Sequence, residues 1–185
     1  MSGVGEKEWI NMDATQFTLG RTAFWTWTGS SVDPGEVDSN IRTALTLVSS
    51  SQDFDFRITF DDTTANGPSV GFHTTGTTDT IDHPSTTNPI VYARNAGGAN
   101  PGWNNNDGSV EAAKSAGWMS GVGPIQISRR GSTFYGLING VLDRTFTGTT
   151  GTNAGGFFIG CAGATHAWQV DSVQYRLGPG LPAIA

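Results

Sequence analysis

Apolar and polar residues alternate along much of this chain with a period of two. The clearest case is residues 53–60, where Phe54, Phe56, Ile58 and Phe60 are separated by polar residues. A strand with one buried and one solvated face has this pattern, because successive side chains point to opposite faces of a sheet. Similar or shorter patterns predict further strands at residues 16–28, 40–48, 69–74, 89–93, 125–128, 133–138, 141–146, 157–160 and 170–176.

Turn signals separate these predicted strands. Asn139-Gly140 is a two-residue hairpin signal, and Gly131 lies in a second short turn. Only residues 110–115 suggest a helix, of one or two turns. Many short strands without a solenoid repeat or a linker predict one all-β domain, a sandwich or barrel. The domain is expected to cover residues 1–185, with extended segments at its N-terminus (1–8) and its C-terminus (177–185).

The composition agrees with an all-β domain and argues against several other classes. Of the 185 residues only 14% are charged, while 26 are glycine, which is a poor helix former. The formal net charge of −6 disfavours nucleic-acid binding, which requires a basic surface. The one basic pair, Arg129-Arg130, stands beside a turn and is interpreted as a solvated hairpin end.

The sequence also bears on where the protein is made. It contains no apolar run long enough for a membrane-spanning helix, so membrane insertion is not expected. The first residues lack the basic and apolar blocks of a secretory signal. The single Cys161 has no partner for an internal disulfide. We therefore expect synthesis in a host cytoplasm.

Three segments near the C-terminus resemble a known family in both pattern and order. They are the hairpin 125–142 around Asn139-Gly140, the apolar strand 157–160 that ends at Gly160, and the segment 168–175. Together they resemble laminin-G-like and concanavalin A-like domains of the lectin and glucanase superfamily, although Gln169 and Ser172 depart from the family pattern. The resemblance implies an antiparallel jelly-roll sandwich of two sheets. This fold carries lectins, glycosidases, adhesion modules and viral coat proteins, so the site residues must decide the function.

Catalytic chemistry has little support in the sequence. Glucanases that share this fold place carboxylates at alternate positions of one strand, so that all of them point into one cleft. Only Glu36 is followed by an aspartate two residues later, and the segment Glu36-Val37-Asp38 lacks the third carboxylate of such a strand. The nearest pair, Asp53 and Asp55, shares its strand face with Arg57, and an adjacent arginine favours the ionised form that a general acid must avoid. We predict that the protein is not an enzyme.

No resident cofactor is predicted, and calcium is the metal that remains open. The three histidines lack zinc-ligand spacing. Oxygen ligands for calcium occur in several loops, although the same residues form turns without any ion. The candidate calcium ligands are Asp61, Asp62, Asn66, Asp79, Asp82 and residues 104–107.

An Asn-rich region with two tryptophans provides the candidate ligand site. An exposed indole beside amides and a carboxylate would form a platform for a sugar ring. The alternative is a loop anchored by its own tryptophan. The candidate glycan-binding residues are Trp103, Asn104, Asn105, Asn106, Asp107 and Trp118.

A structural role agrees with the scarcity of lysine and the extended ends. Uncharged polar surfaces suit close contact between subunits, where lysine is depleted. The favoured hypothesis is a non-enzymatic virion protein that decorates or cements a bacteriophage capsid, self-associates and binds the major capsid protein. The alternatives are a glycan-binding adhesin of a phage head or tail fibre, or a bacterial lectin-like carbohydrate-binding module, both with cell-surface glycans as partners.

Overall fold

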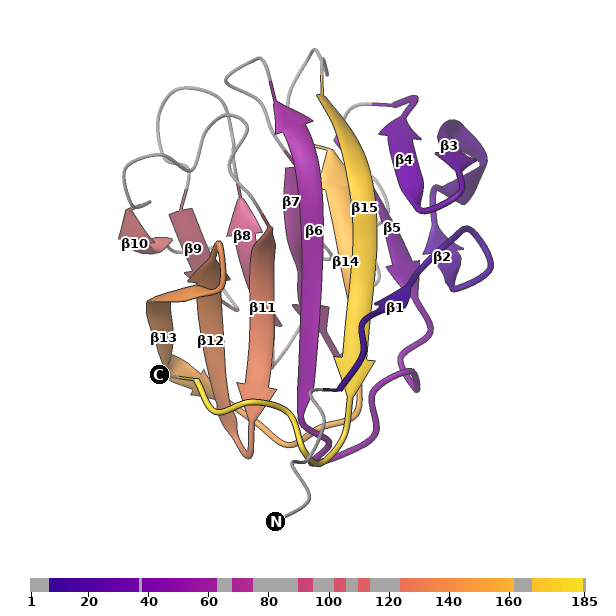
Figure 1. The fold of residues 1–185 in the computed structure, drawn as a ribbon. Helices are drawn as coiled ribbons and strands as arrows, with labels where there is room; N and C mark the ends of the chain where they lie inside the picture. The colour runs from indigo at the N-terminus through magenta and orange to yellow at the C-terminus, as the bar shows by residue number, and fades with distance from the viewer. Residues whose placement is uncertain are drawn as a thin grey trace.

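The computed structural model describes residues 7–36, 38–62, 68–74, 90–94, 102–105, 110–113, 124–161 and 168–184. These residues form two antiparallel sheets that lie face to face, with one short 3-10 helix, η1 (Thr22–Phe24) (Figure 1). No helix in these ranges is long and apolar enough to cross a membrane. The all-β jelly-roll sandwich that the sequence predicted is confirmed.

Sheet A lies in front in Figure 1 and contains both the first and the last strand of the chain. The short β1 (Ile10–Asn11) pairs with β15 outside the main strand order. The other strands lie in the order β13 (Val141–Thr150), β12 (Thr133–Ile138), β11 (Ile125–Arg130), β6 (Phe54–Asp62), β15 (Trp168–Leu177), β4 (Ser31–Pro34) and β3 (Trp25–Thr28).

Sheet B lies behind it and is built from the remaining strands, of which β7 to β10 follow one another along the chain. The strands lie in the order β10 (Val110–Ala113), β9 (Gly102–Asn105), β8 (Ile90–Arg94), β7 (Pro68–His73), β14 (Gly156–Cys161), β5 (Ser39–Thr43) and β2 (Phe17–Gly20).

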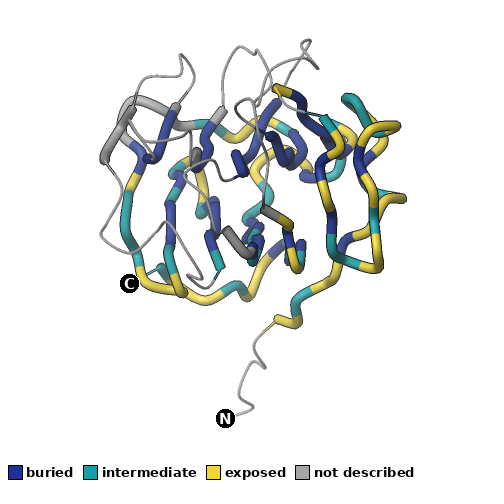
Figure 2. The backbone as a smooth tube through the Cα atoms, turned by 90° about the horizontal axis from the view of Figure 1, so that it is seen from above, coloured by how far each residue is buried: buried dark blue, intermediate teal, exposed yellow. Residues whose placement is uncertain are grey.

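The core lies between the sheets and consists mainly of the alternate apolar residues of the central strands. Phe54 and Phe56 of β6 point inward and meet Phe157 of β14 from the other sheet. The rings of Phe56 and Phe157 are stacked with their centroids 4.2 Å apart. Figure 2 shows the two layers from above, with the buried positions along the strands and the exposed ones mostly along turns. Burial of each such side chain contributes about 1.5–3 kcal/mol to the free energy of unfolding. Because the apolar residues alternate, they all lie on one face of a strand, and that face packs inward.

Most of the predicted strands are confirmed, and two local predictions are wrong. Residues 110–115 were expected to be helical, but β10 pairs with β9 at the edge of sheet B, with Val110 opposite Asn104. Backbone hydrogen bonds to a neighbouring strand outweigh the weak helix propensity of so short a segment. The single strand expected at residues 16–28 is divided by η1 into β2 in sheet B and β3 in sheet A.

The expectation that Arg129 is solvated is also wrong. Arg129 follows Ile125 and Ile127 at an inward position of β11 and is fully buried. Its guanidinium donates hydrogen bonds of 2.6–3.0 Å to the backbone carbonyls of Ser49, Gln52 and Asn153. The guanidinium carbon lies 5.3–6.0 Å from the ring centroids of Phe54, Phe72 and Phe134. Burial lowers the pKa of Arg129 from its ordinary value, and the charge of Asp53 partly offsets this.

Candidate ligand-binding site

The prediction that Trp103 forms an exposed platform for a sugar is wrong. Trp103 lies opposite Ala93 on the inward face of β9 and is fully buried. Its Nε1 donates a 2.6 Å hydrogen bond to Oδ2 of Asp143, and its ring meets Phe146 edge-on. The strand pairing directs the indole between the sheets, so it anchors its own segment and presents no face to a ligand.

Of the other candidate glycan-binding residues, Asn104 is buried, and the side chains of the rest are outside the described part of the structure. Asn104 is buried on the opposite face of β9, where its Nδ2 donates to the carbonyl of Gly102 at 3.0 Å. Asn105 lies on β9, but its side chain is outside the described part of the structure. Asn106, Asp107 and Trp118 lie wholly outside the described residues, so their glycan-binding role stays a prediction.

The calcium candidates also fall largely outside the described structure. Asn66, Asp79 and Asp82 lie outside the described residues, and so do the side chains of Asp61 and Asp62 on β6. Among the side chains that are described, no three His, Cys, Asp or Glu residues come together as metal ligands. Calcium binding stays a prediction.

Gly136 is the position on β12 that makes room for the Trp103 ring. A Cβ atom at Gly136 would lie 2.8 Å from three atoms of the indole. The variant Gly136→Ala is therefore expected to lower the free energy of unfolding by about 2 kcal/mol, because either the ring or the strand must shift. Urea denaturation measures this. The same substitution in a Trp103→Phe background is the control, and an undiminished cost there would contradict a clash with the indole.

The middle of the outer face of sheet B carries polar side chains such as Asn40, Arg42 and His73, and these are buried. It centres on Phe158, whose ring centroid lies 5.9 Å from that of Tyr92 and 6.1 Å from that of His73. Arg42 lies opposite Phe158 on the neighbouring strand and is 5% exposed. The described side chains of this face therefore offer little surface to a ligand.

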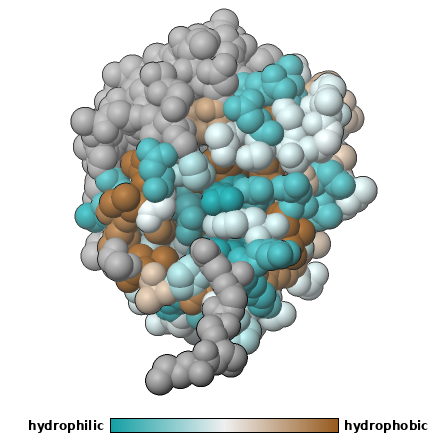
Figure 3. Space-filling view, viewed as in Figure 1, coloured by the Kyte–Doolittle hydropathy of each residue, from teal (hydrophilic) through white to brown (hydrophobic). Residues whose placement is uncertain are grey.

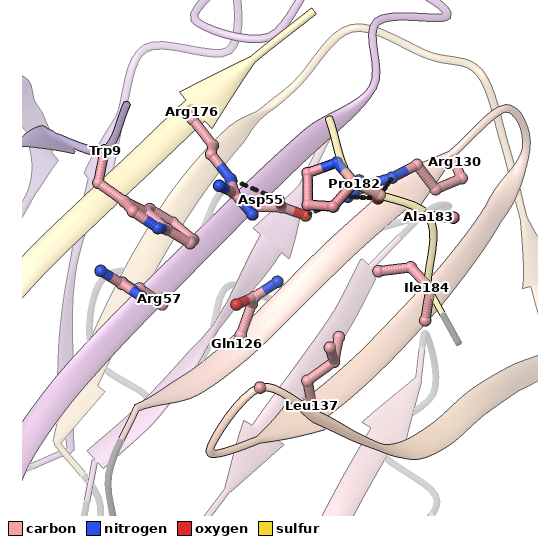
Figure 4. A pocket seen from close by; sticks show the side chains of 11 residues that line it. Trp9, Asp55, Arg57, Gln126, Arg130, Leu137, Arg176, Pro182, Ala183 and Ile184 are labelled. Carbon is pink, nitrogen blue, oxygen red and sulfur yellow. Dashed lines mark hydrogen bonds and ion pairs between the residues drawn. The ribbon is translucent and has the colours of Figure 1, made fainter. Parts of the chain in front are cut away.

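The outer face of sheet A, in contrast, carries an open pocket of about 240 Å³ (Figure 4). Its floor is formed by outward side chains of β6, β11 and β15, and its walls come from the two ends of the chain and the β12–β13 hairpin. The described lining residues are Trp9, Asp55, Arg57, Gln126, Arg130, Leu137, Gly140, Arg176, Pro182, Ala183 and Ile184. In the view of Figure 3, hydrophilic residues occupy the middle of this face, with apolar residues beside them.

A buried carboxylate organises the floor of this pocket. Asp55 is 0% exposed and forms ion pairs with Arg130 (Nη2–Oδ1, 2.8 Å) and Arg176 (Nε–Oδ2, 2.7 Å). The Ser128 hydroxyl donates to Oδ1 of Asp55 at 2.6 Å and accepts a bond from Nε2 of Gln126 at 2.8 Å. The strand register explains the cluster, because Asp55 pairs with Ser128 on one side and with Arg176 on the other.

The same arginines hold both terminal segments against sheet A. Arg130 donates to the carbonyl of Pro182 through Nε (3.1 Å) and Nη2 (2.9 Å), and Arg176 donates through Nη1 to the carbonyl of Lys7 (3.1 Å). Figure 1 shows the yellow C-terminal segment crossing the lower ends of the sheet A strands. The described parts of these segments thus pack on their own domain, and contact with a neighbouring subunit stays a prediction.

Trp9 forms the aromatic wall of the pocket. The guanidinium carbon of Arg57 lies 3.7 Å from the centroid of a Trp9 ring, and that of Arg176 lies 4.3 Å away. Nε of Arg57 also donates to Oε1 of Gln174 at 2.8 Å, which fixes the guanidinium on the sheet. Trp9 itself is only partly buried, so some of the indole reaches the surface. No local sequence pattern marks Trp9 as a site residue, because its partners Arg57 and Arg176 are far away in the chain.

The pocket offers binding groups rather than a catalytic pair. Its described lining supplies three guanidiniums, one amide, an indole and several apolar side chains, with a single carboxylate that is buried under two ion pairs. Glycosidases use two carboxylates across the scissile bond, and that arrangement is not present among these residues.

Comparisons with known proteins assign no family to this chain. No family model matches this chain, and no curated protein matches it. Among solved structures, the exoplasmic/lumenal domain of VIP36 in its Ca2+/Man3GlcNAc-bound form is similar with a TM-score of 0.46 and 11% identity, over 90% of this chain and 82% of that chain. Its Ca2+/Man2-bound form gives a TM-score of 0.47 and 8% identity, over 96% and 90%. Similarity at this level says nothing of the ligand of this chain.

Proposed function

We propose that this chain is a non-catalytic carbohydrate-binding module whose site is the pocket on the outer face of sheet A. The observation that carries the proposal is Trp9, a partly exposed indole at the wall of a cavity with guanidinium and amide groups on its floor. Sugars combine apolar C–H faces, which pack on aromatic rings, with hydroxyls that require hydrogen-bond partners. Apolar walls with a few convergent polar groups meet both needs.

The size and rigidity of the pocket support a small polar ligand. A volume of about 240 Å³ lies just below the range of roughly 300–1,000 Å³ that is usual for small-molecule sites, and suits a sugar ring or two rather than a large cofactor. The floor is held by adjacent strands and by the hydrogen bonds around Asp55. Groups that are already fixed lose little entropy on binding, which favours affinity.

The proposal predicts that Trp9→Ala abolishes most of the binding. Loss of the aromatic wall is expected to weaken binding of any glycan hit at least tenfold, since an aromatic contact at a binding site contributes about 1–2 kcal/mol. A glycan array followed by calorimetry measures this. Phe24→Ala is the matched control, because Phe24 is an exposed aromatic outside the pocket. Equal loss in both variants, or no array signal from the wild type, would overturn the proposal.

The role as a virion decoration protein stays a sequence-based hypothesis, as does location in a virion. It was motivated by extended ends that need a surface to pack on. The hydrogen bonds of Arg130 and Arg176 to the ends of the chain provide such a surface within the domain. A glycan-binding adhesin or a bacterial lectin-like module is therefore the better-supported alternative.

A further inference from the structure

One polar atom in the pocket floor, the amide oxygen of Gln126, has no hydrogen-bond partner among the described residues. Gln126 lies on the outward face of β11, between Arg57 of β6 and Leu137 of β12, and is only 6% exposed. Its Nε2 donates to Ser128, whereas no described residue donates to its Oε1, which still reaches solvent. A nearly buried acceptor without a donor is costly, and this one is available to a molecule bound in the pocket.

The hydrogen bonds behind Gln126 determine which end of its amide faces the pocket. Asp55 is paired with two arginines as a carboxylate and offers only acceptors. Ser128 has a single hydroxyl hydrogen, which it donates to Oδ1 of Asp55 at 2.6 Å. The Ser128 oxygen therefore accepts its 2.8 Å bond from Gln126, which places Nε2 on the Ser128 side. In the view of Figure 4, Oε1 lies on the other side, toward Arg57 and Trp9.

This acceptor defines which sugars fit the pocket. A sugar hydroxyl donates a hydrogen bond to an amide oxygen. A carboxylate, a sulfate or a methyl ether at the same place has only acceptors and would set its lone pairs against those of Oε1. A site built to hydrogen-bond a hydroxyl rejects analogues without it, because its own buried polar group is then left unpaired. The cavity of about 240 Å³ has room for such a ring at the Trp9 wall.

We infer that Gln126 makes the pocket specific for neutral sugars, because its Oε1 accepts a hydrogen bond from a free hydroxyl of one sugar ring that packs at Trp9. This inference rests on the proposed carbohydrate-binding function, and it adds the class of sugar and the residue that selects it. Ser128 is a positioning residue, which acts through the orientation of the Gln126 amide.

An array of neutral, carboxylated and sulfated glycans tests the class of sugar on the full chain. The wild type is expected to bind neutral glycans. Gln126→Met keeps the length of the side chain but removes the acceptor, and is expected to lose these signals. Gln169→Met is the matched control, because Gln169 also donates through Nε2 to a serine, Ser31, but is not part of the pocket lining. This control is expected to bind like the wild type, and thermal melting confirms that each variant is folded.

Nuclear magnetic resonance titration with single-ring probes assigns the hydroxyl. The probes are the methyl glycosides of glucose, galactose and mannose, and derivatives of each in which one hydroxyl is replaced by fluorine, which cannot donate. At one ring position the fluorine is expected to weaken binding to the wild type about tenfold. In Gln126→Met this penalty is expected to fall below about twofold, because the acceptor is gone. In Ser128→Ala it is also expected to shrink, because the amide can then turn its nitrogen toward the pocket.

The outcomes separate this inference from the proposed function. An equal fluorine penalty in the wild type and Gln126→Met, or no penalty at any position, would overturn the role of Gln126 and leave carbohydrate binding in place. Array signals confined to carboxylated or sulfated glycans, or no binding of any of the three glycosides, would do the same to a site for one neutral ring. An unchanged penalty in Ser128→Ala would overturn the positioning role of Ser128. No binding of any sugar, here or on the array, would overturn the proposed function and the inference with it.

Discussion

Replacement of Arg129 by alanine is expected to lower the free energy of unfolding by about 4 kcal/mol. Arg129 is fully buried, and its guanidinium satisfies the backbone carbonyls of Ser49, Gln52 and Asn153. A buried acceptor without a donor costs about 1–3 kcal/mol, and the missing side chain leaves a cavity beside three phenylalanine rings. The alanine variant no longer pays the free-energy cost of burying the guanidinium charge. The net loss in the free energy of unfolding is therefore smaller than the sum of the two costs above.

Urea denaturation monitored by tryptophan fluorescence measures this loss. Arg129→Lys is the informative companion, because it keeps a buried cation but reaches fewer carbonyls, and we expect a loss between those of the wild type and the alanine variant. Arg21→Ala is the control, since Arg21 is partly exposed beside Glu36 and such pairs contribute less than about 1 kcal/mol. Similar losses for Arg129→Ala and Arg21→Ala would show that the buried hydrogen bonds are not what stabilises this end of the sandwich.

The second large effect is expected for Asp55→Asn, with a loss of about 3 kcal/mol. The buried carboxylate neutralises Arg130 and Arg176, and an amide would leave these two guanidiniums without their counter-charge. The same arginines donate to the carbonyls of Pro182 and Lys7. We therefore expect Asp55→Asn to loosen both terminal segments in addition to lowering the stability of the whole domain.

Hydrogen exchange distinguishes these two consequences. In Asp55→Asn, amides of residues 7–12 and 178–184 are expected to exchange faster than global unfolding allows, while those of β14 follow the global stability. Asp53→Asn is the matched control, because Asp53 lies two residues away on the same chain segment and accepts one bond from the Gly131 amide. Unchanged exchange at both ends in Asp55→Asn would contradict the role of this ion-pair cluster in holding them.

The cluster around Asp55 links the stability of the sheet to the proposed site. Its charged groups lie on the outward face of sheet A, where a strand pattern alone predicts only solvated side chains. Pairing across β11, β6 and β15 buries the carboxylate, and the terminal segments close the walls of the pocket above it. Residues that look like ordinary polar surface in the sequence thus become the fixed floor of a binding site.

The sequence by itself determined most of the strands and, in the clearest of them, which face is buried. In residues 53–60 the alternation placed Phe54, Phe56, Ile58 and Phe60 in the core, as the structure confirms. The hairpin at Asn139-Gly140 was equally clear, and both residues have the positive φ angles of 56° and 76° that such a turn requires. These features depend on neighbours within a few residues, so a local pattern specifies them.

Only the tertiary structure decided what covers each face and which distant residues meet. The sequence pattern could not distinguish Trp103 as a core residue from a loop platform, because this depends on the pairing of β9 with β8. The pattern also could not predict that Arg129 is buried, because the carbonyls that accept its hydrogen bonds come from two other segments of the chain. The candidate site brings Trp9, Arg57 and Pro182 together from opposite ends of the chain. Contacts of this kind depend on the order and register of strands across the whole sheet. A local pattern of apolar and polar residues does not specify that order.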